Sequence, residues 1–328
     1  MDPLFRGMLH SLKLESGPAP GRMNRRYKIA VCVATYRRPA QLLRLLNALC
    51  ALDFHAVVEP EIEIIVVDND PDSSASSVFR GFRSSRFRIS YHPEPRRGIS
   101  YARNTAITHG NGSDLVAFID DDEYPSRTWL DALIAAHLEF NAPIVAGPVV
   151  PIVPQPSGSD FAMLLRRLRH PSGTQLQSAG AGNVLISARV LRAMSPTWFD
   201  PRFAISGGED THFFRRCLAA GFPIVWADDA IVYETVPAAR LAPPYLRARA
   251  RNGANHWTRV EMELHPSLLN LSRRFAAGIA RIFEGTLEKY FGGNVEDRMR
   301  GDLRLAEGIG NLYAFFGGTY EMYGASER

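Results

Sequence analysis

The stretch from Leu115 to Glu123 constrains the fold of this 328-residue chain more than any other. Its first five residues, Leu-Val-Ala-Phe-Ile, are apolar, as in a strand that is buried on both faces of a sheet. Four acidic residues, Asp120-Asp121-Asp122-Glu123, follow directly. Carboxylates crowded at the edge of a core are costly unless positive charge lies beside them. Two interpretations stay open: a solvated acidic turn, or a site for a divalent cation such as Mg²⁺ or Mn²⁺.

Strands and helices alternate on both sides of this stretch. Apolar runs at 28–34 and 61–67 predict buried strands, and the leucines between them follow a helical period that starts near Pro39. Such alternation predicts an α/β fold with a mostly parallel sheet. Further strands are expected at 87–91, 144–150 and 183–186 and within 222–233. Further helices are expected at 98–109, from a cap at Ser126 to about 140, from 207–210 to Gly221, and at 268–291 and 302–317.

Composition and charge narrow the class of protein. The chain is 46% hydrophobic, and no run approaches the 18 apolar residues of a spanning helix. The first residues lack a signal-peptide pattern and the three cysteines have no metal-type spacing, so we expect a cytoplasmic protein. The net charge of +4 comes mainly from clustered arginines, which suits a nucleoside diphosphate or an anionic membrane surface. Zinc-finger spacing and RNA-binding aromatic motifs are missing, so no nucleic acid is expected.

Acidic residues also follow the strand at 61–67, as Asp68-Asn69-Asp70, and Thr35 follows the first strand. In open α/β sheets, ligands bind outside the carboxyl ends of the strands. Three strand ends should therefore meet at one edge of the sheet. This placement favours a ligand site over a set of unrelated acidic turns.

Five motifs occur in an order that resembles family 2 glycosyltransferases, over about residues 27–240. They are Val33-Ala-Thr-Tyr-Arg-Arg38, Val66-Val-Asp-Asn-Asp70, Gly98-Ile-Ser-Tyr-Ala-Arg-Asn104, Phe118-Ile-Asp-Asp-Asp-Glu123 and Gly207-Gly-Glu-Asp210. Two later segments, Tyr233-Glu-Thr-Val-Pro237 and Arg249-Ala-Arg-Asn-Gly253, are similar to enzymes of bacterial exopolysaccharide synthesis of the succinoglycan type. The resemblance implies the GT-A fold, a Rossmann-like nucleotide-binding sheet with flanking helices. It also implies transfer of a sugar from a nucleotide-diphospho-sugar with inversion.

The resemblance further implies roles for individual residues. Asp122 would ligate Mg²⁺ or Mn²⁺, and Asp120 or Asp121 would contact the ribose or the metal. Asp210 would be the catalytic base. The nucleotide-sugar would be bound by Thr35, Arg37, Asp68, Asp70, Arg97, Arg103, Asp120 and Asp121, and the acceptor by Gly208, Glu209, Glu234 and Arg251.

Two departures from the family pattern matter. Family members commonly have a histidine near the position of Glu234, which leaves a metal role there in doubt. The Gln-x-x-Arg-Trp motif of processive synthases is missing, so we expect one sugar to be added per event. The expected donor is a UDP-sugar.

The expected organisation is a tail at 1–24, a GT-A domain at 25–245 and a helical region at 246–328. Leu268, Leu271, Phe275 and Ile279 with nearby arginines predict that this last region contacts an anionic membrane, on the inner face of the plasma membrane. The expected acceptor is a glycan or a lipid-linked saccharide. Two alternative functions remain: a sugar-phosphate nucleotidyltransferase, and a non-catalytic module that binds glycans or membranes.

Overall fold

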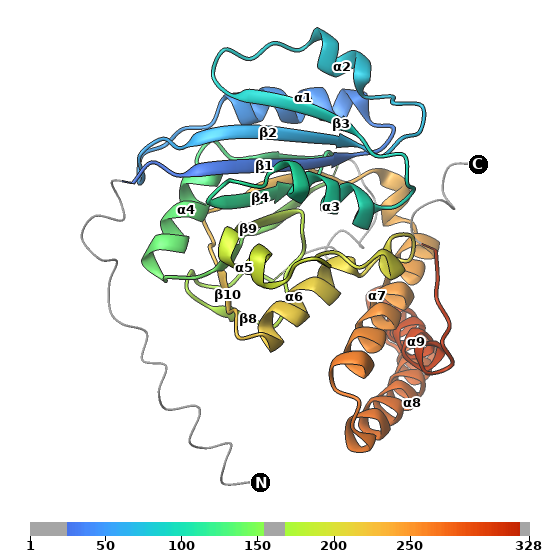
Figure 1. The fold of residues 1–328 in the computed structure, drawn as a ribbon. Coiled ribbons are helices and arrows are strands. Elements are labelled where there is room, and N and C mark those ends of the chain that lie inside the picture. Colours follow the sequence, from blue (N-terminus) through green and yellow to red (C-terminus); the bar gives the residue numbers. More distant parts are fainter. Residues whose placement is uncertain (1–24, 154–167, 322–328) are drawn as a thin grey trace, which may run out of the picture.

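A sheet of eight strands in the order β3-β2-β1-β4-β9-β6-β10-β8 forms the centre of the computed structural model, which describes residues 25–153 and 168–321 (Figure 1). Two strands run against their neighbours: β9 is antiparallel to β4 and β6, and β8 to β10. The other pairs are parallel, which confirms the α/β expectation. The strands are β1 (Lys28–Thr35), β2 (Glu61–Asp68), β3 (Arg88–Pro93), β4 (Leu115–Ile119), β6 (Ile144–Ala146), β8 (Gln175–Leu176), β9 (Asn183–Ser187) and β10 (Ile224–Trp226).

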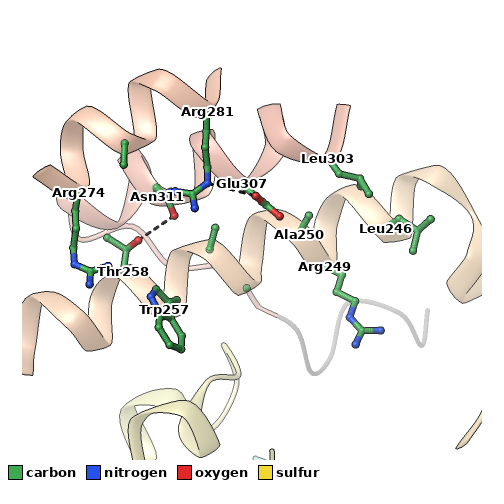
Figure 2. A pocket seen from close by; sticks show the side chains of 13 residues that line it. Leu246, Arg249, Ala250, Trp257, Thr258, Arg274, Arg281, Leu303, Glu307 and Asn311 are labelled. Atoms are coloured by element: carbon green, nitrogen blue, oxygen red, sulfur yellow. Dashed lines mark hydrogen bonds and ion pairs between the residues drawn. The ribbon is translucent and has the colours of Figure 1, made fainter. Parts of the chain in front are cut away.

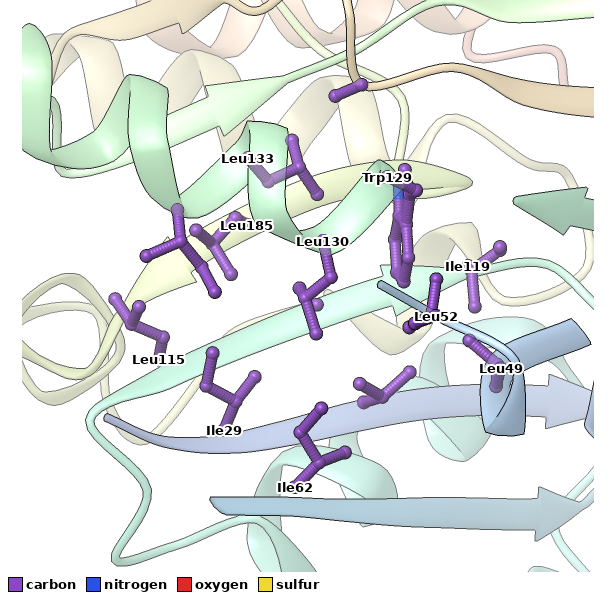
Figure 3. Packing of buried hydrophobic residues seen from close by; sticks show 14 of the residues in the cluster. Ile29, Leu49, Leu52, Ile62, Leu115, Ile119, Trp129, Leu130, Leu133 and Leu185 are labelled. Carbon is purple, nitrogen blue, oxygen red and sulfur yellow. The ribbon is translucent and has the colours of Figure 1, made fainter. Parts of the chain in front are cut away.

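Helices cover both faces of this sheet because the strands carry apolar residues on alternating sides. In β1, Ile29 and Val31 pack on the face covered by α1 and α4, whereas Ala30 and Cys32 pack under α3, α5 and α6. Figure 3 shows the first of these clusters, with Trp129 and Leu130 of α4 above the strands. The helices are α1 (Pro39–Cys50), α2 (Ser76–Gly81), α3 (Ile99–His109), α4 (Trp129–Glu139), α5 (Ala188–Ala193) and α6 (Glu209–Ala219).

The single strand expected at 144–150 is wrong, because this segment is divided between two sheets. Ile144–Ala146 is β6 of the large sheet, and β7 (Val149–Ile152) joins β5 (Glu123–Pro125) and β11 (Val232–Thr235) in a three-stranded sheet. The division falls at Gly147-Pro148, where Pro148 has no amide hydrogen to donate. A Cβ at Gly147 would collide with the carbonyl oxygen of Ala230.

The expected cap at Ser126 is also wrong. α4 begins at Trp129 with Thr128 at the N-cap position, and no side chain caps it. The carbonyl of Ser126 instead accepts a 3.1 Å hydrogen bond from the amide of Trp129, and the amide of Ser126 donates to Ile231. Ser126 therefore contacts the start of α4 through its backbone carbonyl and not through a capping side chain. The sequence also predicts a long excursion from the fold at 151–180, because four prolines and a basic run interrupt the pattern there. Residues 154–167 of it lie outside the described residues.

Three long helices follow the sheets: α7 (Pro243–Leu264), α8 (Leu268–Phe291) and α9 (Val295–Phe315). α7 packs on α6, and α9 packs on both α7 and α8 (Figure 1). None of the helices in the described part of the chain has the length and apolar character needed to cross a membrane. The division of the chain near residue 245 stays a prediction.

Candidate active site

The carboxyl ends of β1, β2 and β4 meet at one edge of the sheet, because these strands are parallel neighbours. Thr35 and Asp68 are paired in register at the ends of β1 and β2. Asp120, Asp121 and Asp122 form the turn between β4 and β5, and the Thr35 hydroxyl donates a 2.8 Å hydrogen bond to Asp121 Oδ2. The structure thus brings the three strand ends together as the sequence predicts.

The two arginines after β1 both contact acidic groups of this edge. Arg37 has a left-handed backbone, with φ of 53°, which turns the chain from β1 into α1. Its Nε donates to Asp70 Oδ1 at 3.3 Å. Arg38 Nη1 lies 2.9 Å from both Asp121 Oδ1 and Asp122 Oδ2. Arg38 therefore supplies the positive charge that the acidic cluster requires.

A second arginine completes this arrangement from the 3-10 helix Ala238–Leu241, which follows β11. Arg240 donates to Asp122 Oδ2 at 3.3 Å and to Glu234 Oε1 at 2.9 Å. Asp121 is 4% exposed, and burial raises its pKa to about 6 although Arg38 opposes this effect. The cluster is therefore partly buried and paired, which rules out a freely solvated acidic turn.

The loop after β2 is organised by Asp68, whose side chain is fully buried. Its carboxylate accepts hydrogen bonds from the amides of Asp70 and Ala75 and, at 2.8 Å, from the hydroxyl of Tyr91. Asn69 donates to the carbonyls of Glu94 and Arg96. Asp68 thus shapes the loop that carries Asp70. An aspartate directly after a strand commonly forms such a turn, because its side chain accepts hydrogen bonds from nearby amides.

Arg103 links the acidic turn to the start of α6. Its guanidinium lies 3.0 Å from Asp120 Oδ1 and also contacts the Glu209 carboxylate. Burial raises the pKa of Glu209 to about 7, although the charge of Arg103 acts in the opposite direction. Through this pair, the residue beside Asp210 is connected to the edge formed by β1, β2 and β4.

The first turn of α6 also packs against α7. Gly208 has φ of 89°, and a Cβ there would lie 2.5 Å from Cγ of His256. The side chain of His256 in α7 thus packs directly on the backbone of Gly208, in the space that a larger residue would fill. The next carboxylate, Asp210, is half-buried, and its Oδ1 accepts a 2.6 Å hydrogen bond from the amide of Thr211.

Two further predicted residues lie in other segments. Arg97 is exposed in the loop before α3. Arg251 stacks on the ring of Tyr320, 3.8 Å from its centroid, at the contact of α7 with the end of the chain. Arg38, Arg240 and Tyr91 contact the acidic groups and were not predicted. The adjacent pair Arg37-Arg38 was the available signal, but the sequence does not say which arginine faces which carboxylate.

A cavity of about 620 Å³ lies elsewhere, between α7 and the α8–α9 pair (Figure 2). Arg249, Trp257 and Arg281 are among the residues that line it, and Arg281 lies 3.6 Å from Glu307. It forms because α7 and α8 both pack mainly on α9 and contact each other little. The cavity is therefore separate from the acidic edge of the sheet.

The described residues contain no group of three His, Cys, Asp or Glu side chains that could hold a metal ion. Asp122 nevertheless suits a cation that takes its other ligands from a bound diphosphate, as Mg²⁺ commonly does. Its side chain is 18% exposed, and two guanidinium groups already place positive charge at its Oδ2. Asp122 therefore offers the type of donor that such a cation prefers, and in this structure two guanidinium groups occupy its Oδ2.

Comparison with known proteins identifies the family. Residues 30–199 match the model of glycosyl transferase family 2. The succinoglycan biosynthesis protein ExoM of Rhizobium meliloti (strain 1021) is 32% identical over 253 residues, which are 74% of this chain and 78% of ExoM. This relative confirms the predicted resemblance to succinoglycan-type enzymes.

Solved structures share the fold at low sequence identity. The mannosyltransferase PcManGT of Pyrobaculum calidifontis superposes with a TM-score of 0.60 and 18% identity, over 96% of this chain and 93% of PcManGT. TarS of S. aureus gives a TM-score of 0.50 and 17% identity, over 89% of this chain and 92% of the TarS chain. The nucleotidyltransferase and non-catalytic alternatives have no support from these matches. The chain belongs to glycosyl transferase family 2 and is a glycosyltransferase of the GT-A fold.

Proposed function

We propose that this enzyme moves one sugar from a UDP-sugar to a hydroxyl of a saccharide or a lipid-linked saccharide, with inversion, in polysaccharide biosynthesis. The observation that carries the proposal is the Arg103 bridge, which joins the Asp120 turn to the helix that carries Asp210. ExoM is named for succinoglycan biosynthesis, and the two solved structures contain GDP-Man with Mn²⁺ and UDP, respectively. The proposed location is cytoplasmic and peripheral, at the inner face of the plasma membrane.

Donor binding is assigned to the carboxyl edge of the sheet. Thr35, Asp68 and Asp70 would contact the nucleoside, with Arg37 beside them. Asp120 and Asp121 would contact the ribose, while Arg97 and Arg103 would face the diphosphate. Arginine suits that last role because its planar fork matches phosphate oxygens.

A divalent cation, Mg²⁺ or Mn²⁺, would be held by Asp122 with Asp120 and would neutralise charge on the departing diphosphate. Arg38 and Arg240 already occupy Asp122 Oδ2. A cation held through Oδ2 would require at least one of these guanidinium groups to move, and that group could then pair with a phosphate oxygen. The carboxylate of Asp122 would thus have a positive partner both without and with the bound cation.

Asp210 would accept the proton from the attacking acceptor hydroxyl. Direct displacement at the anomeric carbon requires one base and no protein nucleophile, unlike the paired carboxylates of retaining glycosidases. Gly208, Glu209, Glu234 and Arg251 are the assigned acceptor contacts. Because Glu209 is 2% exposed and in contact with Arg103, we propose that it acts mainly by positioning that arginine.

The base is tested with Asp210→Asn, which keeps the size of the side chain and removes the proton acceptor. We expect kcat to fall roughly 10²–10⁴-fold, the usual contribution of a general base, while donor affinity stays within about twofold. Asp229→Asn, at an exposed carboxylate, is the matched control and should behave as wild type. Normal turnover by Asp210→Asn would remove this residue from the mechanism.

The metal is tested by binding. Titration calorimetry with UDP should give tighter binding with Mn²⁺ than with EDTA in the wild type, and Asp122→Asn should abolish that difference. Asp72→Asn is the control, because Asp72 is an 83% exposed carboxylate at the same edge. If wild-type affinity is equal with and without Mn²⁺, the metal does not belong to the donor site.

A further inference from the structure

The outward face of α8 exposes eight large apolar side chains to solvent. At about 100° per residue, they fall within an arc of roughly 160° and run the whole length of the helix. Their exposed fractions range from 39% at Phe275 to 85% at Leu268. We call this surface the α8 apolar face: Leu268, Leu269, Phe275, Ile279, Phe283, Leu287, Tyr290 and Phe291.

The α8–α9 pair is packed with its smallest residues inside. A Cβ at Gly285 would lie 2.5 Å from the amide nitrogen of Leu305, and a Cβ at Gly308 would lie 2.8 Å from the carbonyl oxygen of Gly278. Gly301 is equally tight against the backbone at Lys289. In water, helices normally bury their large apolar residues against each other. Glycines between helices with large apolar residues outside are typical of helices in lipid.

The two aliphatic hydroxyls of the α8 apolar face are already bonded within the helix, and the remaining hydroxyl, that of Tyr290, lies at its C-terminal end. Ser272 Oγ donates to the carbonyl of Leu269 at 3.1 Å, and Thr286 Oγ1 donates to that of Ile282 at 2.7 Å. A protein partner usually finds hydrogen-bonding groups across an interface. Hydrocarbon instead requires that polar groups be satisfied within the helix. Ser272 and Thr286 meet that requirement, and a tyrosine at the end of the face suits the membrane–water interface, where its ring is buried and its hydroxyl is hydrated.

The charge of α8 suits an anionic surface. The helix carries four basic residues, Arg273, Arg274, Arg281 and Lys289, against Glu284 and Glu288. Arg274, Arg281 and Lys289 are paired with acids of α7 and α9, namely Glu261, Glu307 and Asp302. Arg273 is exposed and borders the apolar face, so it is the basic residue of α8 that can meet an anionic headgroup there. Leu271, which the sequence assigned to this face, is half-buried and points elsewhere on the helix.

We infer that the α8 apolar face lies in the headgroup–acyl boundary of an anionic bilayer. A helix that cannot span the membrane, with one apolar face and a net positive charge, lies in the plane of the interface. This inference deepens the peripheral location proposed above by naming the surface, and it does not depend on the donor chemistry. A second copy of the chain is the competing occupant.

Sedimentation with vesicles of phosphatidylcholine, with or without 30% phosphatidylglycerol, tests the inference on the full chain. We expect wild type to bind the anionic vesicles and the Ile279→Ser/Phe283→Ser variant to bind them at least tenfold more weakly. Leu43→Ser/Val58→Ser, at similarly exposed apolar sites of the GT-A domain, should bind as wild type. Metal-dependent donor hydrolysis without vesicles should be unchanged in both variants, so a failure of the proposed function is seen separately.

A gain-of-signal variant covers the case in which the double variant does not fold. Phe283→Trp should be quenched by lipids brominated on the acyl chain, and Leu43→Trp should not. The inference is overturned if wild type ignores anionic vesicles, or if neither tryptophan is quenched more than the native background. It is also overturned if wild type forms a stable dimer that Ile279→Ser/Phe283→Ser abolishes, because the face then belongs to a second copy.

Discussion

At the scale of residues, the candidate site is held together by arginine–carboxylate pairs that cross between elements. Arg38 binds the acidic turn from the start of α1, Arg103 binds it from α3, and Arg240 binds it from beyond β11. Each pair is at least partly buried, so removing one partner leaves a charge with poor solvation. The turn is thus positioned by three separate segments of the chain.

The loop beside the site depends on another such pair, at Glu94. Its carboxylate accepts hydrogen bonds from the amide and guanidinium of Arg96 and from the hydroxyl of Thr105. These bonds lower the pKa of Glu94 from 4.5 to about 2, and the bond from the Arg96 side chain has the largest effect. The carbonyl of Glu94 also accepts from Asn69, which connects this loop to Asp68–Asp70.

We expect Glu94→Gln to lower the free energy of unfolding by about 2 kcal/mol at pH 7, the loss typical of hydrogen bonds to a charged group. A carboxylate with a lowered folded-state pKa stabilises the fold above its unfolded value. The difference from wild type should therefore be full above about pH 5 and shrink as the pH falls from 4.5 toward 2. Urea unfolding at several pH values measures this. If the difference in unfolding free energy does not change with pH, the charge of Glu94 is not what stabilises the fold. Glu139→Gln, at an exposed residue, is the control and should unfold as wild type.

At the scale of elements, the tight packing of α8 on α9 has a direct consequence for stability. We expect Gly285→Ala to destabilise the protein by about 1–3 kcal/mol, because backbone atoms of α9 occupy the space that the methyl group requires. Gly253→Ala in α7 is the matched control, since nothing lies within 4 Å of its Cβ position. Alanine there should be neutral or stabilise the helix by up to about 1 kcal/mol. Thermal unfolding compares the two; equal melting temperatures would contradict the close helix contact.

At the scale of the whole molecule, one carboxylate of α7 joins α6, which packs on the large sheet, to α8. Glu261 of α7 is 3% exposed and contacts both Arg215 of α6 and Arg274 of α8. Two residues along the same helix, Glu263 pairs with Arg202 and His212 but is 41% exposed. The two acids thus provide a buried and a solvated ion pair in one helix.

We expect Glu261→Gln to lower the free energy of unfolding by about 3–5 kcal/mol, because it leaves two arginines unpaired at a buried position. Glu263→Gln should cost at most about 1 kcal/mol, since solvent screens the exposed pairs. Chemical denaturation of both variants measures the contrast. If the two substitutions cost the same, Glu261 does not join α6 to α8 in this way.

The sequence by itself determined those features that depend on local pattern and strand order. The run 115–119 is a strand with the predicted bounds, because five consecutive apolar residues fit a position between two helix layers. The meeting of Thr35, Asp68 and the acidic turn follows from parallel strands whose carboxyl ends share an edge. Five short motifs in order then identified the family before any geometry was considered.

Tertiary structure alone decided the features that depend on contacts between distant residues. Arg38 reaches Asp121 and Asp122 of the acidic turn, and Arg37, with its left-handed backbone, reaches Asp70 of the loop after β2. Gly208 meets His256, 48 positions away, instead of standing open. The segment at 144–150 splits because the backbone at Ala230 comes close to Gly147. The amphipathic period of α8 was legible in the sequence, but only the packing of its glycines on α9 decided which side faces outward.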